Sequence, residues 1–432
     1  MLEVKHILDD IDEVTRRLKG RDPSIDLSPL LGLDAERRRV IKEVEELQAR
    51  KNAASKEIGA LKKTGQDISG TQAEMKALSD TISDMEHRRV QAEAAVTAFI
   101  EVLPNIPVDP TPLIPDKSGN TVVRTWGEIR KAADWPFPFR NHIEVGESLG
   151  IRGGLDFPRA ARMTGTGWPL YRGDLARLEW ALVWFLIDRA CTSDRELILP
   201  PFLVNSRSMF SSGQYPKFRD QAYECRDDDL VLLPTSEVAL LNLYRDEILP
   251  DDVLPLRLAS FTPCFRREAG TYGKDERGLI RIHQFNKVEI FALTRPEESA
   301  SELEAMIQHA QSVMEELDLP YRTTLLAAGD IAQQSACTYD IEVWLPGQDA
   351  FSEVSSVSNC TDYQARRGSI RYRPADKKKP EFVHTLNGSA LATSRLMVAI
   401  LEQYQQADRG LLVPKALRPY FGGREQIDPT PA

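Results

Sequence analysis

Residues 261–291 read FTPCFRREAGTYGKDERGLIRIHQFNKVEIF. Two segments with the character of strands flank a loop that is rich in Gly, Lys, Asp and Arg. Functional groups of several kinds occupy both segments: Arg266, Arg267, Glu268, His283, Phe285, Lys287 and Glu289. Alternate residues of a strand face the same side, so the last four should share one face. A guanidinium binds a phosphate or carboxylate through paired hydrogen bonds, which indicates a site for an anionic substrate.

The alternative for this stretch is a solvated antiparallel hairpin whose charges pair across the strands. A single Arg-x-Glu would favour that alternative. The convergence of arginine, carboxylate, histidine, lysine and aromatic groups on one short hairpin favours a binding site instead.

Composition bounds the class of protein. A chain of 432 residues should form two or three domains, and a net charge of −10 gives no global indication of a nucleic-acid partner. The five cysteines form no C-x-x-C pair, which argues against a disulfide framework or zinc site. The longest apolar run, 180–187, is far shorter than the roughly 20 residues of a membrane span. We expect a cytoplasmic protein without a signal peptide.

An a/d heptad pattern runs from Asp34 to Leu103 and is interrupted at 62–70 by KKTGQDISG. Two such segments joined by a short turn predict an antiparallel coiled-coil hairpin. Seam positions whose numbers sum to 136 pair well, for example Leu61 with Met75. A proline-rich segment starting at Pro104 should end the second helix.

The two helices of this hairpin differ in charge. Residues 35–63 carry nine Lys/Arg and five Asp/Glu, whereas 71–103 carry three and six. Basic side chains off the seam are candidates for contact with a phosphate backbone: Arg38, Arg39, Lys42, Arg50, Lys56 and Lys63. By charge alone, an ordinary solvated coiled-coil face explains them equally well.

The rest of the chain mixes strand and helix patterns without regular alternation. Helices are predicted over 173–190, 297–317 and 390–405, and strands over 197–204, 230–234, 339–345 and 350–356. Pro200 and Pro201 interrupt the first of these strands, which indicates a sheet edge or an interface. This pattern predicts an antiparallel α+β sheet, and no GxGxxG or GxxxxGK[ST] phosphate loop is present.

Three further clusters carry polar groups at strand or helix ends. Thr235, Ser236 and Glu237 follow a strand and suit an ammonium group, or simply cap a helix. Glu353 and Ser356 supply the hard oxygens that Mg²⁺ prefers, or are exposed strand polarity. The sequence Asn387-Gly388-Ser389 precedes a helix that carries an arginine at 395, and such an arginine usually faces solvent.

The order of these clusters resembles the motifs of class II aminoacyl-tRNA synthetases. The hairpin at 261–291 resembles motif 2, and HTLNGSALATSRLMVAILE at 384–402 resembles motif 3. The segments TSE at 235–237, GLIRIHQFNKVEIF and TYDIEVWLP, with the coiled-coil arm, are similar to seryl-tRNA synthetase of the bacterial type. The resemblance covers 1 to about 423. Ala390 and Ala392-Thr393-Ser394 depart from it, and only local repacking is expected there.

This resemblance implies a serine–tRNA ligase with an antiparallel class II catalytic core and a coiled-coil arm. It would activate L-serine with ATP, form seryl-adenylate, and charge tRNA(Ser) and tRNA(Sec). The implied domains are a tRNA-binding domain over 1–104 with its hairpin at about 34–103, a linker over 105–119, a catalytic domain over 120–423 and a tail over 424–432. A homodimer with motif 1 at its interface, and tRNA bound across the dimer, are implied as well.

Roles for individual residues follow from the same resemblance. Arg266 would bind the α-phosphate and the serine carboxylate, Glu268 the adenine, and Arg395 the γ-phosphate. The implied serine-binding residues are Thr235, Ser236, Glu237, Arg266, Glu289 and Ser389. The implied ATP-binding residues are Arg266, Arg267, Glu268, Phe285, Glu353, Val354, Ser355, Ser356 and Arg395. Among these, Glu353 and Ser356 would hold Mg²⁺ through ATP, with no zinc.

Two other functions stay open on the sequence. A paralogue could activate serine or another small amino acid for a biosynthetic pathway or a carrier protein, although carrier-protein relatives lack the arm. A synthetase-like RNA-binding protein without catalysis would have a broken motif, whereas Arg266, Glu268, Glu289, Glu353 and Arg395 are all present.

Overall fold

The computed structural model describes residues 1–432 except 64–66, 68, 150–153, 192–193, 269–276 and 430–432. The chain divides into two compact units. Unit 1 comprises Met1–Lys19 and Pro23–Leu103, and unit 2 comprises Gly20–Asp22 and Pro104–Ala432. The segment expected to be a linker, 105–119, lies in unit 2. There the buried side-chain amide of Asn105 donates to the carbonyl oxygens of Gln334 and Cys360, at 2.9 and 2.8 Å.

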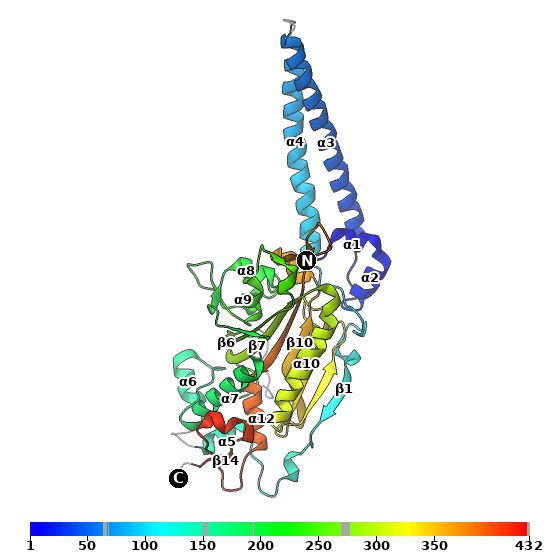
Figure 1. Ribbon diagram of the computed structural model, residues 1–432. Coiled ribbons are helices and arrows are strands. Elements are labelled where there is room, and N and C mark those ends of the chain that lie inside the picture. Colours follow the sequence, from blue (N-terminus) through cyan, green and yellow to red (C-terminus); the bar gives the residue numbers. More distant parts are fainter. Residues whose placement is uncertain (64–66, 68, 150–153, 192–193, 269–276, 430–432) are drawn as a thin grey trace. The chain divides into compact units, whose positions relative to one another are not determined.

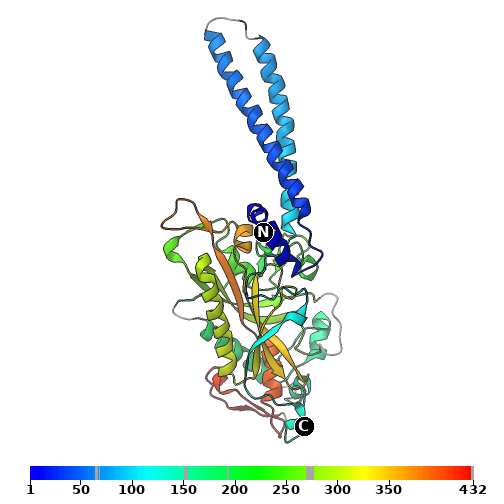
Figure 2. The same ribbon diagram turned by 90° about the vertical axis from the view of Figure 1, so that its right-hand side faces the viewer.

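Unit 1 is helical. Its elements are α1 (Val4–Asp9), α2 (Ile11–Lys19), α3 (Ser28–Lys63) and α4 (Ser69–Glu101). The long helices α3 and α4 lie side by side in both views (Figures 1 and 2). Seam residues Val40, Val44 and Met85 are buried together with Leu47 against them, as the heptad pattern predicts.

The core of unit 2 is an eight-stranded sheet in the order β1-β8-β9-β10-β13-β7-β6-β2. Neighbouring strands are antiparallel except for β2, which pairs with β6 in parallel at the edge. The strands are β1 (Thr121–Trp126), β2 (Glu196–Ile198), β6 (Leu256–Phe265), β7 (Gln284–Thr294), β8 (Tyr321–Leu325), β9 (Cys337–Leu345), β10 (Ala350–Asn359) and β13 (His384–Ala392). The predicted antiparallel α+β fold is confirmed.

Helices and small sheets surround this sheet. The helices are α5 (His142–Ser148), α6 (Phe157–Thr164), α7 (Asp174–Ala190), α8 (Ser206–Ser211), α9 (Glu237–Asn242), α10 (Ser299–Glu316), α11 (Tyr363–Gly368) and α12 (Thr393–Gln403). Of the small sheets, one pairs β3 (Leu203–Val204) with β4 (Val231–Leu232) and another pairs β14 (Leu411–Leu412) with β15 (Gln426–Ile427). The third has β11 (Arg371–Arg373) between β5 (Ile248–Pro250) and β12 (Glu381–Phe382).

Strand alternation in β7 separates the core from the site. Val288, Ile290 and Ala292 point into the main hydrophobic core, which also contains residues of α7, α10 and α12. Figure 1 shows α10 lying along the sheet. The alternate residues, Lys287 and Glu289, face the other side and line a cavity there. The two-residue period of a strand therefore places charge on one face and apolar packing on the other.

Two elements differ from the sequence prediction. The segment 197–204 is not one strand, because Pro200 and Pro201 separate β2 from β3. The last helix begins at Thr393 instead of Ala390, because β13 continues to Ala392, which pairs with Lys287 after an irregularity in register. The ladder hydrogen bonds of the sheet outweigh the helical propensity of Ala390 and Leu391.

Candidate active site

A cavity of about 400 Å³ opens on the face of the sheet away from the main core. A second cavity of about 280 Å³ adjoins it and shares Arg266, Glu268, Arg281, Lys287 and Glu353 in its lining. Strands β6, β7, β10 and β13 and the start of α12 supply the walls. The site is therefore assembled from segments spread over much of unit 2.

The end of the β6–β7 hairpin contributes the arginine and the aromatic ring. The guanidinium of Arg266 lies 5.2 Å from the ring centroid of Phe285, a cation–π geometry. Glu268 adopts a left-handed backbone conformation with φ of 49°, and its carboxylate pairs with Arg281 at 2.6 Å. The hairpin loop at 269–276 lies outside the described residues. Arg266, Glu268 and Phe285 all line the smaller cavity, so these groups converge as the sequence predicts.

His283 behaves differently from the other three residues predicted to share a strand face. It precedes β7, and its ring lies 5.4 Å from Trp168 and 6.3 Å from Tyr223. Its Nδ1 contacts the carbonyl oxygen of Arg266 at 3.1 Å. His283 therefore supports the hairpin and lines a neighbouring cavity with Glu268, because the strand alternation begins only after it.

The buried end of the larger cavity holds two carboxylates and a lysine. Lys287 Nζ lies 2.5 Å from Glu289 Oε2 and donates to Thr235 Oγ1 at 2.6 Å. Thr235 Oγ1 in turn accepts the backbone N–H of Glu237, at 3.2 Å. Thr235 thus accepts the first N–H of α9 and faces the cavity, whereas the N-cap position itself is Ser236, whose side chain makes no capping hydrogen bond.

Amide groups from distant segments fix the carboxylate of Glu237. Its Oε1 accepts hydrogen bonds from Gln364 at 2.6 Å, Asn387 at 3.2 Å and Gln334 at 3.4 Å. Burial, and then the charge of Glu289, raise the pKa of Glu237 to about 7. A buried carboxylate held by neutral donors beside a second carboxylate is suited to a cationic ligand group.

The other end of the site is formed by β10 and α12. Arg395 Nη1 donates to the carbonyl oxygen of Glu353 at 2.5 Å and lies 3.7 Å from its carboxylate. Arg395 Nε donates to the carbonyl oxygen of Ile280 at 3.3 Å. Ser356 lines the larger cavity, and Ser389 lines both. Arg395, predicted from a weak signal, is thus directed into the site.

Phe285 and Arg395 line only the smaller cavity, and four further residues named from the sequence do not line the larger cavity. Arg267 is exposed, and its backbone N–H donates to Gln221. Ser236 is fully buried behind Thr235. Ser355 Oγ donates to the carbonyl oxygen of Ser389 at 2.6 Å, and Val354 belongs to the main core while bordering the smaller cavity. The side chains of Ser236, Val354 and Ser355 are buried beside the site, and Arg267 contributes a backbone hydrogen bond.

Sequence reasoning missed several groups that the fold brings to this site. The residues concerned are Arg281, Gln334 and Gln364. Lys287 was predicted on the strand face of Phe285 and Glu289, and Asn387 in the polar cluster before the last helix, but neither was assigned a role in binding. The amides come from an irregular segment, α11 and β13, and carry no periodic signal. Arg21 is another such residue, because its guanidinium donates to the carbonyl oxygens of Ile331 and Ala332 beside the cavity.

The candidate phosphate contacts of unit 1 all lie on α3 and are exposed. Three of them pair with acidic residues of the same helix: Arg38 with Asp34, Arg39 with Glu36 and Glu43, and Lys42 with Glu46. The pairs of Arg39 and Lys42 are exposed on both sides, and such pairs are worth little and can be exchanged for other anions, whereas Asp34 is buried. None of the helices in the described parts of the chain has the length and apolar character to cross a membrane.

The antiparallel sheet, the charged β6–β7 hairpin and the arginine at the start of α12 define a class II aminoacyl-tRNA synthetase core. Residues 221–404 match the family model of the tRNA synthetase class II core domain (G, H, P, S and T). Residues 1–107 match the model of the seryl-tRNA synthetase N-terminal domain. The chain belongs to the seryl-tRNA synthetase family, and the resemblance seen in the sequence is confirmed.

Individual relatives agree over the full length. The serine–tRNA ligase of Symbiobacterium thermophilum is 45% identical over 420 residues, covering 97% of this chain and 98% of the relative. The seryl-tRNA synthetase of Pyrococcus horikoshii complexed with ATP has a TM-score of 0.93 at 35% identity, with each chain fully covered. The cytoplasmic serine–tRNA ligase of Naegleria fowleri in complex with AMP has a TM-score of 0.86 at 27% identity, covering 97% and 96%.

Proposed function

We propose that this protein is a serine–tRNA ligase that joins serine to ATP and then charges tRNA(Ser) and tRNA(Sec). The observation that carries this proposal is the buried pair of carboxylates, Glu237 and Glu289, in the larger cavity, with Arg266 where the two adjoining cavities meet and Arg395 in the smaller one. Such a site can accept an ammonium group and a polyphosphate at the same time.

The carboxylate end would bind serine. Glu237 and Glu289 attract the ammonium group, and Thr235 and Ser389 offer hydroxyl groups close to them. A polar pocket that hydrogen-bonds the hydroxyl of a substrate discriminates against alanine, because alanine leaves the polar groups unpaired. Lys287 already neutralises Glu289, so we assign the ammonium contact chiefly to Glu237.

The arginine end would bind ATP. Arg266 would neutralise the α-phosphate, Phe285 would stack on the adenine, and Glu268 would accept the exocyclic amino group of adenine. Arg395 would contact the γ-phosphate. No nucleophilic side chain is required, because placing the reactants and stabilising charge is sufficient for this chemistry.

Two steps complete the reaction. In the first, a carboxylate oxygen of serine attacks the α-phosphorus in line, and the bond to pyrophosphate breaks, which yields seryl-adenylate. In the second, a ribose hydroxyl at the 3′ end of the tRNA attacks the serine carbonyl carbon. An ester forms, and AMP leaves with the electron pair of the broken anhydride bond.

The donor set of β9 and β10 fits Mg²⁺ carried by ATP. Glu353 is about half exposed and faces the cavities, and Ser356 pairs with Asp340 in the strand register. Asp340 Oδ1 is buried without a hydrogen-bond partner, and burial together with the charge of Glu353 raises the pKa of Asp340. Hard oxygen ligands crowded in this way favour a divalent cation. Bound there, Mg²⁺ would neutralise phosphate charge, while Glu353 and Ser356 hold it in place.

We assign a homodimer interface to the edge of the sheet in unit 2. Helix α7, edge strand β2 and the residue that follows it expose large apolar side chains: Trp180, Trp184, Leu197 and Leu199. An apolar sheet edge of this kind invites pairing with a second copy. We further propose that tRNA binds across the dimer and that the protein acts in the cytoplasm.

The decisive experiment is serine-dependent exchange of pyrophosphate into ATP. We expect exchange with serine, and little with alanine, threonine or glycine. An absence of exchange with serine would contradict the proposal, and preferential exchange with another small amino acid would favour the paralogue. Exchange without charging of tRNA(Ser) would contradict the second step.

The role of the arm is tested by replacing residues 34–103 with a short Gly/Ser linker. Unit 2 contains the complete candidate site, so exchange should persist while charging of tRNA is lost. Loss of both activities in a folded variant would show that the arm does more than bind tRNA.

A further inference from the structure

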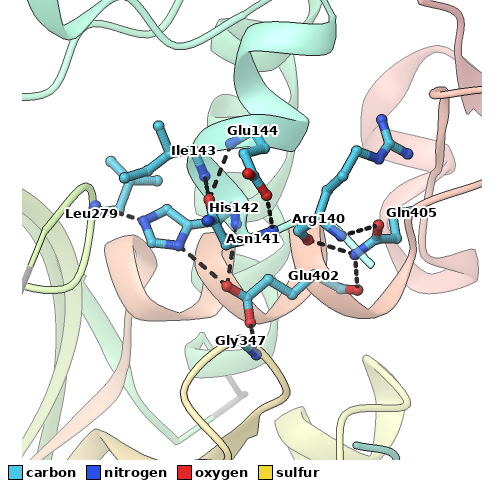
Figure 3. Close-up of polar contacts among 9 residues, drawn as sticks. All are labelled: Arg140, Asn141, His142, Ile143, Glu144, Leu279, Gly347, Glu402 and Gln405. Carbon is cyan, nitrogen blue, oxygen red and sulfur yellow. Dashed lines mark hydrogen bonds and ion pairs between the residues drawn. The ribbon is translucent and has the colours of Figure 1, made fainter. Parts of the chain in front are cut away.

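A buried polar cluster behind the ATP end of the site connects α12 to three other segments of unit 2. Its centre is formed by His142, the first residue of α5, and Glu402 of α12, with side chains 5% and 2% exposed. Figure 3 shows both side chains directed toward each other, with Leu279 and Gly347 on opposite sides of the pair. None of these residues was singled out from the sequence.

Glu402 binds two of these segments, the start of α5 and the turn between β9 and β10. Its Oε1 accepts the backbone N–H of His142 at 3.1 Å and contacts His142 Nδ1 at 3.3 Å. Its Oε2 accepts the backbone N–H of Gly347 at 2.8 Å, in the turn between β9 and β10. A side chain at Gly347 would come within 2.6 Å of Glu402, so the turn approaches the carboxylate closely.

His142 holds the third segment, the return of the hairpin toward β7. Its Nε2 accepts the backbone N–H of Leu279 at 3.2 Å. A backbone N–H cannot accept, so Nε2 is unprotonated and Nδ1 carries the hydrogen that is donated to Glu402. Gly278 has φ of 74°, and a Cβ at this position would lie 2.1 Å from His142 Nε2. The segment is therefore seated tightly on the histidine.

The residues that follow Leu279 make contacts within the ATP end of the site. The carbonyl oxygen of Ile280 accepts Arg395 Nε, and Arg281 pairs with Glu268. Arg395 lies on the same helix as Glu402, two turns before it. His142 and Glu402 thus fix the hairpin return and α12 relative to each other. The relative placement of Arg395, Arg281 and Glu268 depends on that fixed point.

The N-terminus of α5 is itself held firmly. Asn141 Oδ1 accepts the N–H groups of Ile143 and Glu144, and Glu144 Oε2 accepts the N–H of Asn141, which forms a capping box. Gln405 exchanges hydrogen bonds with the backbone of Arg140, with its side-chain nitrogen donating at 2.8 Å and its oxygen accepting at 3.1 Å. His142 consequently projects from a helix start that several hydrogen bonds hold in place (Figure 3).

We propose that His142 and Glu402 are positioning residues for ATP: they set the hairpin return against α12 so that the nucleotide contacts of both are in register. This inference rests on the proposed function of the site. Neither residue lines the two cavities of that site, so their effect is transmitted through Leu279, Gly347 and the backbone. A misplacement of about 1 Å in such a support can cost 10²-fold in rate.

Two substitutions of His142 separate this role from ordinary core stability. In His142→Gln the side-chain oxygen can take the place of Nε2 and accept from Leu279. In His142→Asn the amide can take the place of Nδ1 and donate to Glu402, but it cannot reach Leu279. We expect the KM for ATP to change less than threefold in the Gln variant and to rise about tenfold in the Asn variant. The KM for serine should stay within twofold in both.

Gly278→Ala provides an independent variant that leaves both central side chains intact. Its added methyl group must displace the same segment, so the KM for ATP should again rise with little change for serine. If His142→Asn does not fold, the KM for ATP of Gly278→Ala tests the positioning role. His384→Asn is the matched control, since His384 bonds to Ser299 at 2.9 Å away from the ATP end. It should lower the melting temperature and leave the KM for ATP unchanged.

Calorimetric titration with ATP in the absence of serine gives a readout that does not depend on turnover. The Kd for ATP should follow the same order: wild type and His142→Gln close together, His142→Asn and Gly278→Ala weaker. Equal ATP affinity in the Gln and Asn variants, or equal weakening for serine and ATP, would overturn the inference. If the ATP affinities of the wild type and the variants follow this order, but the wild type shows no serine-dependent exchange, only the proposed function would be contradicted.

Discussion

Glu237 is the residue whose charge should set the pH range of serine binding. Its carboxylate must be ionised to bind an ammonium group, and burial raises its pKa to about 7. Serine binding should therefore weaken as the pH falls through 7, and the KM for serine should rise about tenfold between pH 8 and pH 6. Pyrophosphate exchange measured over this range checks the prediction.

The neighbouring carboxylate supplies the control for this titration. The charge of Glu289 is one cause of the raised pKa of Glu237, so Glu289→Gln should move the midpoint of the profile to lower pH. A midpoint that does not move would contradict the assignment. The effect of Glu237 on folding stability has the opposite pH dependence. Because its pKa is raised in the folded protein, this carboxyl group adds to the free energy of unfolding below pH 4.5, and the contribution is lost as the pH rises through 7.

Thr393 is a second residue with a measurable effect, and it lies where the chain departs from motif 3. Its hydroxyl donates to Glu179 Oε1 at 2.5 Å, and Asn286 donates to the same oxygen at 2.9 Å. Burial raises the pKa of Glu179. Thr393→Val removes a donor from a buried carboxyl and should lower the free energy of unfolding by about 1–3 kcal/mol.

Urea denaturation measures this change, and a double variant tests its cause. Glu179→Met combined with Thr393→Val replaces both partners and should recover much of the loss. Thr164→Val is the control, because the Thr164 side chain is exposed and bonds only within its own helix. An equal loss in the control would contradict the explanation through Glu179.

At the scale of elements, we expect the arm and the sheet to carry separable activities. If α3 contacts the phosphate backbone, Arg50→Ala with Lys56→Ala should raise the KM for tRNA about tenfold. The slope of the logarithm of the tRNA binding constant against the logarithm of the salt concentration should become shallower by about one to two. Serine-dependent exchange should not change, because the candidate site lies entirely in unit 2.

Charging kinetics at several salt concentrations provide the measurement. Lys76→Ala, an exposed lysine of α4, is the matched control and should leave the salt slope unchanged. If Lys76 has the same effect as the pair on α3, the charge difference between the two helices has no bearing on tRNA binding.

At the scale of the whole molecule, the exposed apolar edge of unit 2 predicts a dimer. Leu199 is 76% exposed in the single chain, so Leu199→Asp should leave the fold intact and oppose the burial of this edge against a second copy. Light scattering should then report half the wild-type mass. Met163→Asp, at another strongly exposed apolar position, should keep the dimer. A wild-type mass equal to that of one chain would refute the assignment.

Much of this molecule could be predicted from local periodicity. The heptads between Asp34 and Leu103 predicted α3 and α4, and the alternation of Phe285, Lys287 and Glu289 predicted one wall of the site. The prediction failed at Ala390, where sheet pairing overrides helical preference, and at His283, which precedes the strand. Periodicity reports only which residues face a common direction within one element.

The sequence by itself determined the family, the antiparallel α+β fold class and the arginine and carboxylate groups of the site, because these depend on residue type and local order. Only the tertiary structure decided what surrounds them. The amides on Glu237, the bond between Thr393 and Glu179, and the connection of His142 to Leu279 and Glu402 join residues 97 to 260 positions apart. Such contacts arise from the packing of sheet and helices, and no local pattern in the chain encodes them.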